Sequence, residues 1–143
     1  MILQLTPNTH PILHERVKPC SKDLDRSEIS HILKENMVHY EGVGLSANQI
    51  GISERVFVMM LNMETEETIT CFNPRIIKRY EDNVWCEEGC LSFPDEIINI
   101  QRPNRIVVKY EDEDKKDHKI KLDGLASRAV SYTHLTLPTI YSV

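Results

Sequence analysis

The prediction of both architecture and chemistry depends most on the pentapeptide Glu88-Gly89-Cys90-Leu91-Ser92. A glycine lets another backbone approach closely, and a short turn after the cysteine would expose its thiol and the following amide. As a thiolate, Cys90 would serve as a nucleophile or as a soft metal ligand. Most free cysteines, however, are small buried core residues. The pentapeptide alone leaves these interpretations open.

A second motif precedes it, with the sequence Gly42-Val43-Gly44-Leu45-Ser46-Ala47-Asn48-Gln49. A phosphate cradle is weakly supported, because no helix is predicted to follow the glycines. The motif suits better a loop that lets a ligand backbone pass close by. Gln49 then offers an amide donor to a carbonyl oxygen, although a lone glutamine is more often an internally satisfied polar group.

Composition narrows the class of protein. The chain has 143 residues, of which 41% are hydrophobic, and this predicts one domain with a core. The net charge of −5 argues against a nucleic-acid or anionic-membrane surface, since both need clustered Lys and Arg. No apolar run approaches the ~20 residues of a membrane span, and the N-terminus lacks the features of a secretory signal. We therefore expect a cytoplasmic protein whose four cysteines form no disulfides.

The coarse pattern predicts one helix followed by many short strands. The helix is expected to begin at Ser27 as N-cap and to end at Glu41-Gly42. Strands are expected at 56–61, 68–72, 75–80, 96–100, 105–110 and 119–122, the first of them buried on both faces. Asn73-Pro74 should stop the second strand, Arg102-Pro103-Asn104 should form a turn, and residues 111–117 should form a solvated hairpin tip. This order predicts an α+β domain.

Together the two motifs resemble the first two signature motifs of the peptide deformylase family. Supporting matches lie at Asn73-Pro74, at Arg102-Pro103 and at Leu125-Ala126-Ser127-Arg128-Ala129, so the resemblance covers residues 1–129. Ser46 stands where the family commonly has alanine. The resemblance implies an N-terminal helix, short and mostly antiparallel sheets, and a central C-terminal helix with a His-Glu-x-x-His motif.

The resemblance also implies a chemistry. Peptide deformylases are cytoplasmic metallohydrolases that remove the formyl group from the N-terminal formyl-methionine of nascent chains at the ribosome. One divalent metal, Fe²⁺ or a substitute such as Zn²⁺, Ni²⁺ or Co²⁺, is held by a cysteine and two histidines. We expect such a protein to act as a monomer, with no membrane segment and no direct nucleic-acid motif.

Carried over by motif, Cys90 is the metal ligand, and Gln49 and the backbone N–H of Leu91 stabilise the oxyanion. The residues expected to contact the substrate are Val43, Gly44, Leu45, Gly89 and Leu91. Glu88 and Arg102 are expected to form a buried pair that holds the cysteine loop.

The third signature motif is missing from the chain. Counted in register after Arg128-Ala129, Tyr132 stands at the first histidine, Thr133 at the glutamate and Thr136 at the second histidine. The stretch that follows opposes helix formation, because it contains Pro138 and several β-branched residues. His10 and His14 stand four apart, but Pro11 lies between them. We therefore expect this chain to hold metal poorly and to be inactive.

The tail offers an explanation. The residues Val130-Ser131-Tyr132-Thr133-His134-Leu135-Thr136-Leu137-Pro138-Thr139 match the translation of a transposase mosaic-end sequencing adapter read on its reverse strand. Our hypothesis divides the chain into a C-terminally truncated deformylase-like domain, 1–129, and a non-native tail, 130–143; a natural divergent C-terminus is the alternative. A missing central helix would remove on the order of ten kcal/mol of apolar burial, against a net stability of ~5–15 kcal/mol. The chain is then expected to be aggregation-prone or molten.

Two other functions remain as alternatives. A non-catalytic relative would keep the peptide groove and bind N-terminal peptides without metal. A thiol enzyme would use Cys90 as nucleophile, but no histidine is placed by the sequence to act as its base.

Overall fold

Strand β2, Val56–Asn62, supplies side chains to two separate cores. Val56 and Val58 belong to one cluster of buried side chains, whereas Phe57 and Met59 belong to another. Successive side chains of a strand point to opposite faces, so both faces of β2 are covered. The prediction that this run is buried on both faces is confirmed for its first four residues.

The computed structural model describes residues 1–6, 17–62, 64–79, 83–90, 93–103 and 105–123. Side chains are described for the same residues except 79–103. The elements within these described residues are α1 (Arg26–His39), β1 (Gly44–Ser46), the 3₁₀ helix η2 (Ala47–Ile50), β2 (Val56–Asn62), β3 (Glu67–Arg79), β4 (Asn83–Cys90), β5 (Phe93–Pro103), β6 (Arg105–Glu111) and β7 (Asp117–Asp123).

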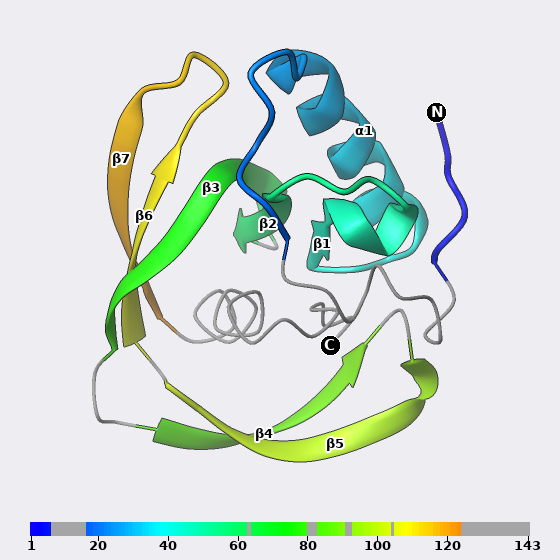
Figure 1. Ribbon diagram of the computed structural model, residues 1–143. Helices are drawn as coiled ribbons and strands as arrows, with labels where there is room; N and C mark the ends of the chain where they lie inside the picture. The colour runs from blue at the N-terminus through cyan, green and yellow to red at the C-terminus, as the bar shows by residue number, and fades with distance from the viewer. Residues whose placement is uncertain (7–16, 63, 80–82, 91–92, 104, 124–143) are drawn as a thin grey trace.

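The strands form two antiparallel sheets. The larger has the order β1-β2-β3-β6-β7, and the smaller is the β4-β5 hairpin. In Figure 1 the long strand β3 curves through the molecule and connects the region near α1 to the β6-β7 hairpin. One helix beside an antiparallel sheet is the α+β architecture expected from the sequence.

Helix α1 packs on one face of the larger sheet. Its apolar positions Ile29, Leu33 and Met37 recur at helical spacing and are buried in the cluster that contains Val56 and Val58. The opposite face carries the second cluster, in which β2 and β3 meet β6 and β7 through Phe57, Met59, Cys71, Ile106, Val108, Tyr110 and Leu122. No helix in the part of the chain that the structure describes is long and apolar enough to cross a membrane.

The predicted N-cap was wrong by two residues. Asp25, not Ser27, caps α1, and its carboxylate accepts a hydrogen bond of 3.1 Å from the backbone N–H of Glu28. Serine and aspartate both cap helices well, so residue type alone does not decide between Ser27 and Asp25. The helix also ends earlier than expected, at His39.

Asn73-Pro74 does not end a strand, as the sequence suggested, because β3 continues to Arg79. The register with β6 shifts between Phe72 and Arg75, so proline falls in a bulge where no ladder hydrogen bond is required. Asn73 adopts a positive φ of 50° there. Its Oδ1 accepts from the backbone N–H of Cys20 at 2.7 Å, and its Nδ2 lies 3.5 Å from both carboxylate oxygens of Glu111.

Two further boundaries differ from expectation. Strand β5 runs through Arg102 to Pro103, so the predicted turn begins later. The glycine-rich segment predicted as a loop is instead strand β1 followed by the helical turn η2.

The β6-β7 hairpin tip is not simply solvated. Arg26 is 8% exposed, donates to the Glu111 carboxylate and to the Asp112 carbonyl at 2.9 Å each, and stacks over the Phe72 ring. Ser30 lies 2.7 Å from the Thr70 hydroxyl. It also donates to the carboxylate of Glu113. Helix α1 and the hairpin are therefore joined by partly buried polar contacts, although the remaining tip residues are largely exposed.

Asn36 attaches the N-terminal segment to α1. Its side chain is fully buried, accepts from the Leu3 N–H at 2.8 Å, and donates to the carbonyls of Met1 and Ile32 at 2.9 and 2.8 Å. Burial of these polar groups is tolerated because each has a partner.

We expect Asn36→Ala to lower the free energy of unfolding by about 2–3 kcal/mol, because it removes three hydrogen bonds of a fully buried side chain and leaves partly buried backbone groups without this partner. Urea unfolding measures the change, in this chain or in one extended with the missing third motif if the shorter chain does not unfold cooperatively. The control Lys34→Ala on the same helix should change stability by less than about 0.5 kcal/mol. Equal effects of the two substitutions would contradict the role of Asn36.

Candidate active site

The segment that contains Gln49 is a capped helical turn at the edge of the larger sheet. Strand β1 pairs with β2, with Gly44 opposite Met59 and Ser46 opposite Phe57. Ser46 then begins η2, and Gly51 ends it with a φ of 83°, a conformation that favours glycine. All residues from 42 to 50 are buried.

The orientation of the Gln49 amide is set by Ser46. Gln49 is fully buried, and its Oε1 accepts a hydrogen bond of 3.2 Å from the Ser46 backbone N–H. The Ser46 hydroxyl lies 3.1 Å from the same oxygen and 2.6 Å from Oδ1 of Asn48. With the carbonyl end held in this way, the other end of the side chain is the –NH₂ group, which can only donate.

Ser46 and Gln49 form a capping box, which the sequence signals as a serine followed three residues later by glutamine. Ser46 stands where the family commonly has alanine, and its role as a cap was not predicted. The turn is also attached to the N-terminal segment, because Thr6 N–H donates to the Gln49 carbonyl at 2.7 Å and the Thr6 hydroxyl donates to the Asn48 carbonyl at 3.1 Å.

The neighbouring residues predicted to contact substrate differ in what they can offer. The Leu45 side chain is fully buried in the cluster under α1, so only its backbone is available to a ligand. The Val43 carbonyl accepts from the Met60 N–H at 2.8 Å, and the Val43 side chain is 6% exposed. Gly44 begins β1, an edge strand of the described sheet.

The cysteine motif is described through its backbone. Strand β4 ends at Cys90, whose Cα partner is Phe93, and the register shifts between Gly89 and Cys90. Leu91 and all side chains of this hairpin lie outside the described residues, so the role of Cys90 as a ligand stays a prediction.

The pairing register of β4 and β5 shows whether Glu88 and Arg102, the expected buried pair, lie opposite each other. Glu88 lies opposite Ile98, and Arg102 lies opposite Val84, four residues away on β4. Four residues correspond to ~13 Å along a strand. The two residues are therefore not direct cross-strand neighbours, and their contact also stays a prediction.

The described histidines do not complete a Cys-His-His metal site. His31 lies 3.5 Å from Glu35 on α1, His118 lies 2.6 Å from Asp112 at the hairpin tip, and His39 packs against Tyr40. Within the described residues, no group of three or more His, Cys, Asp or Glu side chains can hold a metal. His10, His14 and His134 lie outside them. The side chain of the predicted ligand Cys90 lies outside the described residues, so the described part of the chain supplies no donor set for the metal that the family motifs imply.

Two other cysteines are poor nucleophiles. Burial raises the pKa of Cys71 far above its usual range, and the negative charge of Glu113 adds to the effect. Burial also raises the pKa of Cys20, whose Sγ donates to the Arg55 carbonyl at 3.3 Å. Both are free thiols kept in the neutral form.

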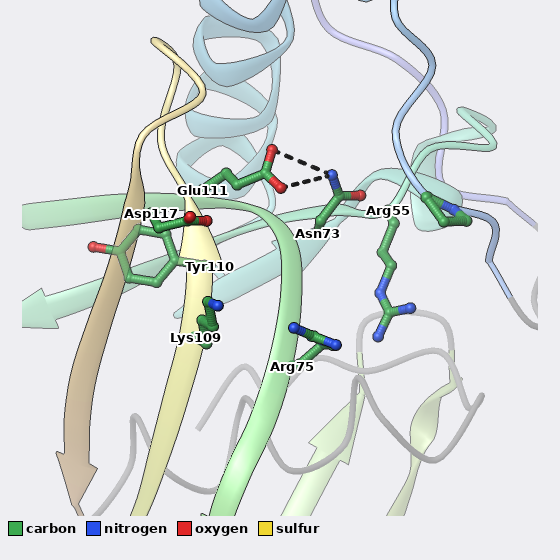
Figure 2. Close-up of a pocket in the computed structure, with 8 residues that line it drawn as sticks. Arg55, Asn73, Arg75, Lys109, Tyr110, Glu111 and Asp117 are labelled. Atoms are coloured by element: carbon green, nitrogen blue, oxygen red, sulfur yellow. Dashed lines mark hydrogen bonds between the residues drawn. The ribbon is translucent and has the colours of Figure 1, made fainter.

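A pocket of about 360 Å³ opens elsewhere, over β3 and β6 (Figure 2). Its lining residues are Pro19, Arg55, Asn73, Arg75, Lys109, Tyr110, Glu111 and Asp117. None of them was predicted as a site residue. None belongs to the capped turn at Gln49 either, so the pocket is distinct from that turn.

Comparison with known proteins identifies the family and the fold. The family model for polypeptide deformylase matches residues 2–134. The peptide deformylase of Thermotoga maritima is 37% identical over 123 residues, which cover 85% of this chain and 73% of that protein. The peptide deformylase of Bartonella tribocorum is 33% identical over 127 residues, with 85% and 71% covered.

Solved structures agree. The crystal structure of the Thermotoga maritima peptide deformylase superposes with a TM-score of 0.86 at 33% identity and covers 96% of this chain and 92% of that chain. The Synechococcus elongatus enzyme in complex with actinonin gives 0.87 at 29% identity, with 95% and 76% covered.

These matches define an α+β protein of a hydrolase class, and the fold expected from the sequence is confirmed. The chain belongs to the peptide deformylase family, a family of metalloenzymes. The matched residues continue past 129, so the boundary between 129 and 130 stays a prediction.

We expect Cys71 to resist alkylation by iodoacetamide at pH 8 in the native chain, because it is fully buried and its pKa is raised. Mass spectrometry of peptides labelled before and after unfolding in urea measures the difference. Labelling of all cysteines in urea is the control, and rapid native labelling of Cys71 would contradict the described core.

Proposed function

We propose that this chain carries the substrate-binding part of a deformylase that removes the formyl group from N-terminal formyl-methionine of newly made polypeptides. The proposal includes action on the nascent chain at the ribosome, a cytoplasmic location and a monomeric state. It also includes one divalent metal, Fe²⁺ or Zn²⁺, Ni²⁺ or Co²⁺, with Cys90 as one ligand. The membership of the family supports it.

The observation that carries the proposal is the fixed Gln49 amide. Hydrolysis of a formyl amide develops negative charge on the carbonyl oxygen, and a donor that is already oriented stabilises this charge without further reorganisation. Ser46 holds the carbonyl end of Gln49, so the –NH₂ end is oriented before substrate arrives. We assign Gln49 and the Leu91 N–H as the two donors.

Strand β1 suggests how the peptide would lie. An extended peptide can add to a sheet edge through backbone hydrogen bonds. Gly44 on β1 and Gly89 on β4 would allow close approach from two sides, and Val43, Leu45 and Leu91 would complete the contacts, Leu45 through its backbone.

The chain as written is proposed to be inactive. Tyr132, Thr133 and Thr136 stand where two ligands and the proton acceptor are required, and none of them can replace histidine or glutamate in those roles.

Restoring the third motif tests the proposal. We would replace residues 130–143 with a helix that carries His-Glu-x-x-His in register and compare formate release from a formyl-methionyl peptide. Activity and bound metal are expected only in the restored chain, and Cys90→Ala in that chain should abolish both. Activity of the chain as written would contradict the proposal. Peptide binding without hydrolysis in the restored chain would support the non-catalytic alternative instead.

In the restored chain, Gln49→Leu should lower kcat by about 10²–10³-fold with little change in KM, because the lost donor acts in the transition state. Ser46→Ala is the matched control. It keeps the backbone N–H that holds Gln49, so its loss should stay below about tenfold. Steady-state kinetics decide, and equal losses in the two variants would contradict the assignment of Gln49.

A further inference from the structure

A row of three cations crosses the larger sheet. Arg75 on β3 is the Cα partner of Lys109 on β6, and Lys109 is in turn the partner of Lys119 on β7. Directly paired residues lie on the same face of a sheet, so the three side chains are neighbours. Like charges directly opposite each other destabilise a sheet, and here two such pairs are adjacent.

The same face carries more positive charge beside this row. Lys78 is the partner of Val107, and Val107 is the partner of Lys121. Val107 lies two residues from Lys109, so these residues share the face of the row. Lys78 and Lys121 are exposed. The cations therefore continue along the strands in a second row.

Two acidic residues, Glu111 and its Cα partner Asp117, lie on this face and line the same pocket as Arg75 and Lys109, but among the described residues neither forms an ion pair with the first row. Glu111, two residues from Lys109, forms an ion pair of 2.9 Å with Arg26. Among the residues whose side chains the structure describes, none forms an ion pair with Arg75, Lys109 or Lys119. Arg75 and Lys119 are exposed, and Lys109 is half-buried.

One end of the row is hollowed. Arg55 and Arg75 line the pocket of about 360 Å³ together with Lys109 (Figure 2). In Figure 2 these three side chains follow one another across β6 and β3, below Glu111 and Asn73. Arg55 is held in place there, because its Nη2 donates to the Pro74 carbonyl at 2.9 Å.

We propose that this basic face, defined as Arg55, Arg75, Lys109 and Lys119, binds the phosphate backbone of a single-stranded nucleic acid. The row as a whole spans three strands, or ~10 Å. A single small anion would need only the pocket, whereas Lys119 on β7 continues the row past it. Several linked phosphates match such a row. The protein as a whole is acidic, with a net charge of −5, so a narrow strand is accommodated better than a broad duplex.

The expected recognition does not depend on base sequence. Tyr110, the aromatic residue of the described β6-β7 hairpin, is buried and stacks on His118, so it offers no open platform for a base. Contacts to phosphates fix position without reading sequence. This inference is independent of the proposed deformylase chemistry, because it uses none of the residues assigned there.

The test measures binding of the full chain to a fluorescent oligouridylate by anisotropy over a range of salt concentrations. The variant Lys109→Glu/Lys119→Glu should bind at least about tenfold more weakly at low salt. Its slope of log K against log salt should be smaller by about 1.4, since each lost single-strand phosphate contact is worth about 0.7. The control Lys22→Glu/Lys34→Glu makes the same change of net charge away from this face and should keep both values.

A second variant, Arg75→Gln/Lys119→Gln, changes two exposed side chains without reversing charge and guards against misfolding. It should reduce the slope by the same amount. Equal loss in the control pair would overturn the proposal, because it would show an effect of net charge alone. Binding of inorganic phosphate or of anionic lipid vesicles without binding of the oligonucleotide would also overturn it.

Discussion

The alternation of β2 between two cores is the constraint on which the rest of the structure depends. Val56 and Val58 face α1, and Phe57 and Met59 face β6 and β7. A shift of register by one residue would exchange these two sets and bury each against the wrong partner. The same register places Ser46 opposite Phe57 and so fixes where η2 begins. The position of Gln49 therefore follows from the packing of β2.

Several parts of this fold could be predicted from the sequence for clear physical reasons. The apolar run at 56–61 is too short for a typical helix and rich in β-branched and aromatic residues, which identifies a buried strand. Asn73-Pro74 was misleading, because proline normally ends a central strand and only the bulge removes the conflict. The choice between Asp25 and Ser27 as cap could not be made without the contact to Glu28.

For the candidate site, too, the sequence motifs could be recognised, but the orientation of the side chains could not be predicted. The motifs containing Gln49 and Cys90 indicate a family, but the direction of the Gln49 amide depends on hydrogen bonds from Ser46. The basic face was not visible in the sequence, because its members come from three strands and from the residue just before β2, and because the net charge is negative. The net charge describes the whole chain, whereas the pairing of strands places charged side chains from distant parts of the sequence next to one another.

Asn73 limits which residues evolution could place at its position. A φ of 50° is costly for most side chains, and glycine, asparagine and aspartate tolerate it best. Glycine would leave the Cys20 N–H without its acceptor, and aspartate would set a second carboxylate beside Glu111. Asparagine alone combines the tolerated backbone with both an acceptor and a donor. The residue at position 73 must therefore suit the backbone of β3, the N–H of Cys20 and the carboxylate of Glu111, which belong to three segments distant along the chain.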